Sequence, residues 1–185
     1  MQGAVPRAMP RVRRWRRRLV GLVLLAGLLA LAALLRAPPE RLTAADGATV
    51  RVMDGDSLHI GERIVRIEGI DAVELHQACR ASDDVQWSCG LEARAALHAL
   101  VGRGGLACAA DDEDRYGRAV ARCAVTGVPD VGRALVEQGW AIHLDQGGGA
   151  RYRDAEAAAR AARRGIWRGD FERPADWRGA HPREN

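Results

Sequence analysis

Residues 54–74 read DGDSLHIGERIVRIEGIDAVE, and this stretch decides the fold. Apolar and polar residues alternate on both sides of the Gly-Glu pair at 61–62, which suits a two-residue hairpin turn. Pairing of the two strands about that turn brings Asp71 back towards Asp56, and Arg66 falls between them in the sequence. Carboxylates that converge with an arginine suggest a metal site that handles phosphate. The alternative is a hairpin whose polar ends are simply solvated.

The remaining pattern predicts further strands and helices after this hairpin. We expect helices at residues 91–101, 130–139 and 152–164, and a second hairpin from residues 106–110 and 118–125. Residues 71–89 are polar, and we expect them to be irregular. The order lacks βαβ alternation, which indicates an α+β domain. Five short strands in two groups suit a five-stranded OB-fold-type β-barrel with about three helices.

The N-terminal segment differs from the rest of the chain. Residues 1–36 hold eight of the 28 arginines and no acidic residue, and residues 19–35 are an unbroken run of apolar residues and glycine. This pattern is typical of an export signal or a signal anchor, so we predict one hydrophobic helix that crosses the membrane once as an anchor. The arginines predict a cytoplasmic N-terminus, with the following domain in the periplasm or outside the cell. Cleavage of the segment would release a secreted protein.

Composition divides the chain into four predicted segments. These are the N-terminal segment at 1–36, a linker at 37–46, a folded domain at 47–177 and a tail at 178–185. Beyond the first segment, 20 arginines and no lysine stand against 24 acidic residues, so the folded part is mildly acidic. The overall pI near 9.3 is therefore no argument for a polyanionic partner, and phosphate chemistry must depend on local arginines and a metal. We expect a monomer.

All four cysteines follow the N-terminal segment, which in an oxidising compartment suggests two disulfides. Cys108 and Cys123 are equidistant from the turn at 114–117, and a regular hairpin would place them opposite each other. That pairing leaves Cys79 with Cys89. A structural zinc site that includes His76 and Cys79 is the alternative, although the sequence lacks a Cys-x-x-Cys motif.

Several short motifs occur together in a recognisable order. They are the DGDS sequence at 54–57, VRIEGIDAVE at 65–74, Cys-Gly at 89–90 before a helix, DRYGR at 114–118, LVEQGWA at 135–141 and GIW at 165–167. Together they resemble the staphylococcal nuclease-like (thermonuclease) family over about residues 47–177. The resemblance implies a calcium-dependent nuclease that hydrolyses phosphodiester bonds of DNA, RNA or both.

The resemblance also implies roles for individual residues. Asp56, Asp71 and the backbone carbonyl of Ala72 would bind Ca²⁺, Glu74 would be the general base or orient the attacking water, and Arg66 and Arg118 would hold the scissile phosphate. This division suits the chemistry, because a hard cation and two guanidiniums neutralise an anionic ester where its charge grows.

Two positions modify this expectation. Val73 stands where the family usually has proline, and a residue without the fixed φ of proline should leave the loop of Glu74 freer. Tyr116, in the turn before Arg118, is the candidate for stacking a nucleobase.

The rival interpretation is a non-catalytic OB-fold module that binds nucleic acid or belongs to the cell envelope. The presence of the complete set of acids and arginines favours the enzyme.

Overall fold

The computed structural model describes residues 11–34, 38–44, 48–145 and 150–182 of the chain. The chain divides into two compact units, Met1–Pro38 and Pro39–Asn185. In the first unit, Arg11–Leu34 form helix α1. Among the described residues, no helix combines the length and the apolar character that crossing a membrane requires. Parts of the predicted N-terminal segment, at 1–10 and 35–36, lie outside the described residues.

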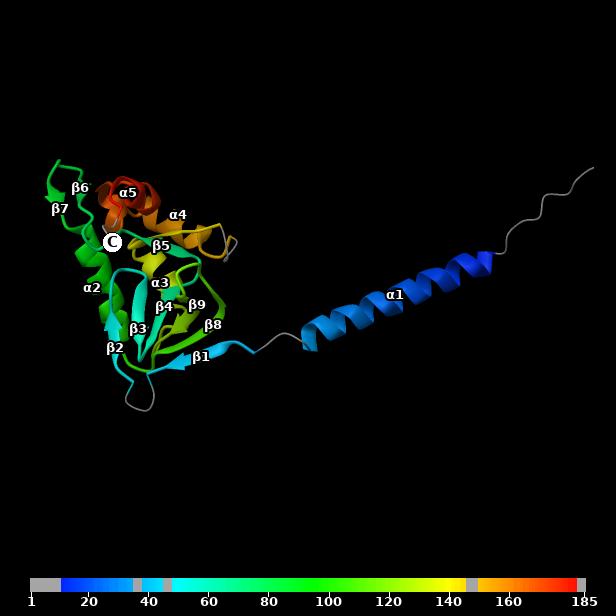
Figure 1. Ribbon diagram of the computed structural model, residues 1–185. Coiled ribbons are helices and arrows are strands. Elements are labelled where there is room, and N and C mark those ends of the chain that lie inside the picture. The colour runs from blue at the N-terminus through cyan, green and yellow to red at the C-terminus, as the bar shows by residue number, and fades with distance from the viewer. Residues whose placement is uncertain (1–10, 35–37, 45–47, 146–149, 183–185) are drawn as a thin grey trace, which may run out of the picture. The chain divides into compact units, whose positions relative to one another are not determined.

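The second unit is built on a six-stranded sheet in the order β1-β8-β9-β4-β3-β2 (Figure 1). The strands are β1 (Glu40–Thr43), β2 (Val50–Val52), β3 (Ser57–Ile60), β4 (Arg63–Ile67), β8 (Ala107–Glu113) and β9 (Ala119–Ala124). Strands β2, β3 and β4 form an antiparallel meander, β8 and β9 form a hairpin, and β4 pairs with β9 in parallel. The result is an OB-fold-like curled sheet, a half-barrel, as the sequence pattern predicted in outline.

Strand β1 corrects one predicted boundary. Its residues were assigned to a linker, but they pair with β8 and add a strand to the predicted five. Leu42 is opposite Cys108 in this pairing and packs into the core with it. Burial of a leucine stabilises a fold by about 1.5–3 kcal/mol, which accounts for the attachment of so short a strand at the edge of the sheet.

The stretch predicted to be irregular, residues 71–89, contains short strands. Strand β5 (Ile70–Ala72) pairs with β10 (Ala141–His143), while β6 (Cys79–Ala81) lies between β7 (Gln86–Trp87) and β11 (Gly169–Asp170). The β5–β10 and β6–β11 pairs involve partners distant in sequence, so local polarity gave no sign of them, whereas β6 and β7 pair within one short stretch. They matter for the site because β5 carries Asp71.

Helices cover the ends and flanks of the sheet in the second unit (Figure 1). They are α2 (Cys89–Val101), α3 (Val131–Glu137), α4 (Arg153–Ala161), α5 (Pro174–Ala180) and the 3₁₀ helix η2 (Gly165–Arg168). The first three correspond to the predicted helices, and Asp130 caps α3 by accepting a hydrogen bond from the Arg133 N–H at 2.9 Å. Helix α5 was not predicted, and it includes Arg178, the first residue of the predicted tail.

Both predicted disulfides are present. Cys108 and Cys123 are directly opposite each other in the β8–β9 hairpin, with Cα atoms 4.0 Å apart. Cys79 and Cys89 join β6 to the start of α2, with Cα atoms 5.6 Å apart. The first bond lies in the main core cluster, and the second in a smaller cluster that also includes Val73.

Candidate active site

The β3–β4 hairpin assembles the acidic part of the site. Arg66 is opposite Ser57 in the hairpin, next to Asp56. The chain then turns through Gly69, which has a φ of 77° that favours glycine, and returns along β5. As a result the Ala72 N–H donates to Asp56 Oδ2 at 3.0 Å. The chain thus returns to Asp56 next to Asp71, as the hairpin pattern predicted.

Arg66 lies between the two buried aspartates. Its Nη1 donates to Asp56 Oδ1 at 2.8 Å, and its Nη2 donates to Asp71 Oδ1 at 2.9 Å. The side chains of Asp56 and Asp71 are only 5% and 2% exposed, and that of Arg66 is 17% exposed. Removing one member would leave buried charge without its partner, so the three residues depend on one another.

Asp56 is held with little access to solvent. The Ser57 hydroxyl donates to its Oδ1 at 2.9 Å, and its own N–H donates to Asp54 Oδ1 at 3.0 Å, which places Asp54 in the turn. Burial is the largest influence on Asp56 and raises the pKa of its carboxyl to about 6, against the opposing effect of Arg66. The negative charges of Asp54 and Asp71 raise this pKa further. A buried carboxylate of this kind favours a compensating cation.

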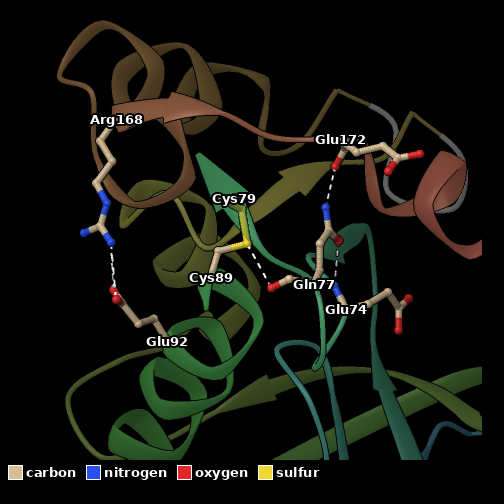
Figure 2. The surroundings of a disulfide bond; sticks show 7 residues. All are labelled: Glu74, Gln77, Cys79, Cys89, Glu92, Arg168 and Glu172. Atoms are coloured by element: carbon tan, nitrogen blue, oxygen red, sulfur yellow. Dashed lines mark hydrogen bonds and ion pairs between the residues drawn. A yellow bond between two sulfur atoms is a disulfide. The ribbon is translucent and has the colours of Figure 1, made fainter. Parts of the chain in front are cut away.

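Glu74 is positioned by Gln77, a buried residue that the sequence did not mark as functional (Figure 2). The Glu74 N–H donates to Gln77 Oε1 at 3.0 Å, and Gln77 Nε2 donates to the Glu172 carbonyl oxygen at 2.7 Å. The amide thus connects the loop after β5 to the segment before α5. A buried amide with both ends bonded holds its neighbours firmly, because either group left alone would be costly.

Packing also holds the loop of Glu74. Val73 is 1% exposed and belongs to the smaller core cluster together with Cys79 and Cys89. A Cβ at Gly90, in the first turn of α2, would collide with the Glu74 carbonyl oxygen, so glycine permits this close approach. The loop that lacks proline is therefore restrained by burial, by Gln77 and by a neighbouring disulfide.

Arg178 is an unexpected member of the cluster. Its Nη1 donates to Asp71 Oδ1 at 2.9 Å and to Glu74 Oε1 at 2.8 Å, and its Nη2 donates to Asp71 Oδ2 at 3.1 Å. These contacts are charge-assisted, and with Asp71 they form a bidentate pair. Glu74 and Asp71 are thus joined through one guanidinium that comes from α5, which packs against β5.

Arg118 and Tyr116 lie in the turn between β8 and β9. Strand β9 is next to β4, with Val120 opposite Arg66, so Arg118 precedes the partner of Arg66 by two residues. The Arg118 guanidinium pairs with Asp114 at 2.7 Å and lies over the Tyr116 ring at 5.6 Å from its centroid. Partial burial opposes ionisation of Asp114, but hydrogen bonds from Arg118 and Tyr116 lower its pKa. Arg118 therefore pairs within its own turn, and Tyr116 is exposed.

The carboxylate oxygens of this cluster are chemically suited to bind a hard cation such as Ca²⁺. Asp56 and Asp71 are buried and converge on a single guanidinium, and carboxylate oxygens are the ligands that Ca²⁺ prefers. Ala72, whose backbone carbonyl is the third predicted ligand, is opposite Ala141 in the β5–β10 pair. In the described part of the chain, however, no group of three or more histidine, cysteine or acidic side chains is arranged to hold a metal ion. Arginine side chains supply the positive charge that the carboxylates face in this structure.

The chain is similar to known proteins over most of its second unit. The model of the family described as Staphylococcal nuclease homologue matches residues 64–169. The succinoglycan biosynthesis protein ExoI of Rhizobium meliloti (strain 1021) is 34% identical over 122 residues. That match covers 65% of this chain and 64% of the relative, so the chain spans less than two thirds of the relative's length. Within the acidic cluster, Asp56 and Arg178 lie outside the range that the family model matches.

Proposed function

This chain belongs to the family of staphylococcal nuclease homologues, and we propose that it is a calcium-dependent nuclease that hydrolyses phosphodiester bonds of DNA, RNA or both. The observation that carries the proposal is the placement of Arg66 between Asp56 and Asp71, with Glu74 tied to the same cluster. A guanidinium and several carboxylates in one buried group can bind a phosphodiester and activate water beside it.

Arg66 and Arg118 are the proposed phosphate ligands. A guanidinium carries its charge at every working pH and can donate two parallel hydrogen bonds to phosphate oxygens. Arg66 extends from β4, and Arg118 lies in the turn just before β9, the strand that pairs with β4, so we propose that one phosphate binds both. Charge on the phosphoryl oxygens increases as water attacks, and the two guanidiniums stabilise that charge most in the transition state.

Glu74 is the proposed general base. Its carboxylate takes a proton from the attacking water while the water oxygen forms a bond to phosphorus, and one ester P–O bond breaks. The leaving oxygen takes a proton from solvent. Gln77 holds the backbone of Glu74 in place, which keeps the carboxylate in position for the water. Ca²⁺ would be held by Asp56, Asp71 and the Ala72 carbonyl, and when bound it polarises the phosphate and lowers the pKa of bound water.

We also propose that the folded unit acts outside the cytoplasm. Two disulfides in a small domain are typical of an oxidising compartment. The arginine-rich N-terminal segment with its apolar run suits an export signal that also associates with the membrane. A C-terminal reporter that is active only in the periplasm should be active in the fusion, and activity from a cytoplasmic reporter alone would contradict export.

Nuclease activity can be tested directly on the oxidised full chain. Supercoiled plasmid and single-stranded RNA should be degraded with Ca²⁺ and preserved with EGTA. Arg66→Ala should lower the rate by about 10²–10³-fold, the usual cost of losing one transition-state donor. Arg122→Ala is the matched control, since Arg122 comes from β9 and pairs on the surface with Asp111. Equal, slow loss of substrate in all samples would show a non-catalytic module.

A further inference from the structure

The end of α5 carries a positive charge into the proposed calcium site. Arg178 is 41% exposed, whereas Asp71, on which it rests, is 2% exposed and Glu74 is 15% exposed. The Arg178 side chain is thus partly open to solvent while its guanidinium N–H groups donate into the acidic cluster. Such a contact can break without exposing the core, because the arginine sits at the rim and the carboxylates sit inside.

Guanidinium groups occupy both oxygens of Asp71. Oδ1 accepts from Arg66 at 2.9 Å and from Arg178 at 2.9 Å, and Oδ2 accepts from Arg178 at 3.1 Å. A calcium ion needs an oxygen lone pair directed at it from about 2.3–2.6 Å. A divalent cation placed there would also repel the nearby guanidinium, since like charges a few ångströms apart in a partly buried site interact strongly.

We propose that Arg178 is an internal cation that competes with calcium for Asp71, so that calcium binding releases the end of α5 from the site. This inference rests on the proposed function, because it uses the same calcium ligands. Release of Arg178 also removes the ion pair that Arg178 makes with the Glu74 carboxylate, the proposed general base. The C-terminal helix therefore sets the calcium concentration at which the site becomes competent.

The surrounding contacts fasten the start of α5 to the rest of the folded unit. Before the helix, the Glu172 carbonyl oxygen accepts from the buried Gln77, and Pro174 at the first position of α5 is buried. Further along, Trp177 is half-buried and stacks on His181, with ring centroids 4.3 Å apart, a contact within the same short segment. The hydrogen bonds of Arg178 thus link the end of α5 to the acidic cluster.

Calcium titration of the full chain tests the competition. After removal of metal with EGTA and dialysis, calorimetry at low salt compares wild type with Arg178→Gln and with the control Arg173→Gln. Arg173 is exposed at the start of α5, and its replacement removes the same charge from the same segment. Arg178→Gln should bind Ca²⁺ about 10-fold more tightly, which is within the usual range for two coupled binding events. The control should remain within about twofold of wild type.

Hydrogen exchange on the wild-type chain gives a second readout that needs no variant. Adding Ca²⁺ should speed deuterium uptake in a peptide covering residues 172–182, because the end of α5 loses its attachment. Slower or unchanged uptake would overturn the competition, as would equal or weaker calcium binding by Arg178→Gln. Those outcomes leave the calcium assignment intact. If neither wild type nor Arg178→Gln binds Ca²⁺, the calcium assignment itself fails and the competition fails with it.

Discussion

Replacing Asp56 with asparagine should change how the stability of the metal-free protein depends on pH. Burial raises the pKa of Asp56 from 3.8 to about 6, so the folded state binds a proton there more tightly than the unfolded state does. Stability from this group is therefore fully present at low pH and is lost as the pH rises from about 4 through 6. The full difference corresponds to about 3 kcal/mol, because a tenfold change in an ionisation constant corresponds to about 1.4 kcal/mol.

Asparagine cannot ionise, so Asp56→Asn lacks this loss. The asparagine amide has an NH₂ group in place of one carboxylate oxygen. That NH₂ must face either the Ala72 N–H or the Arg66 guanidinium, which are both donors, and the free-energy cost of this mismatch is the same at every pH. The prediction therefore concerns the change with pH. Relative to wild type, the free energy of unfolding of the variant should rise by about 2 kcal/mol between pH 4 and pH 8.

Urea unfolding in EGTA at four or five pH values measures this difference. Asp111→Asn provides the control for the loss of one negative charge, because Asp111 is exposed and paired with Arg122 on the surface. The difference in free energy of unfolding between Asp56→Asn and wild type could instead stay constant or fall from pH 4 to pH 8. Burial would then not raise the pKa of Asp56.

Three further predictions concern the loop of Glu74, base stacking and a disulfide. Gln77→Ala should lower the free energy of unfolding by about 1–3 kcal/mol and slow cleavage, because the Glu74 N–H loses its acceptor; a variant with wild-type stability and kcat would contradict this. Tyr116→Ala should weaken binding of single-stranded DNA by about 1–3 kcal/mol in fluorescence anisotropy, with an unchanged Tm because the ring is exposed; unchanged affinity would remove Tyr116 from the site. Replacing Cys79 and Cys89 with alanine should cost about 3 kcal/mol in urea unfolding and should lower activity even at temperatures where the protein is folded. Activity equal to wild type under those conditions would show that this disulfide does not help to hold the loop of Glu74.

Features that depend on neighbouring residues were predictable from the sequence. The turn at 61–62 and the alternation around it gave the β3–β4 hairpin, in which Ile60 and Arg63 pair as expected. The symmetric spacing of Cys108 and Cys123 about the next turn gave their disulfide. In both cases the chain reverses locally, so the register of one turn determines which side chains meet.

Features that depend on distant partners were not predictable in the same way. Strand β1 pairs with β8, which is more than 60 residues away, and its four residues carry little pattern of their own. Arg178 reaches Asp71 across 107 residues, and Gln77 reaches Glu172 across 95. Proline at the first helical position could have suggested α5, but no local rule indicates where a single arginine on that helix will bind.

The rate of cleavage by Glu74→Gln shows whether this cluster is a phosphodiesterase centre. Glutamine keeps the shape of the side chain but removes its ability to take a proton from water. With a defined oligonucleotide, saturating Ca²⁺ and Arg122→Ala as the control, we expect kcat of Glu74→Gln to fall by about 10²–10⁴-fold while KM changes little. A variant that cleaves as fast as wild type would contradict the assignment of this cluster as a phosphodiesterase centre.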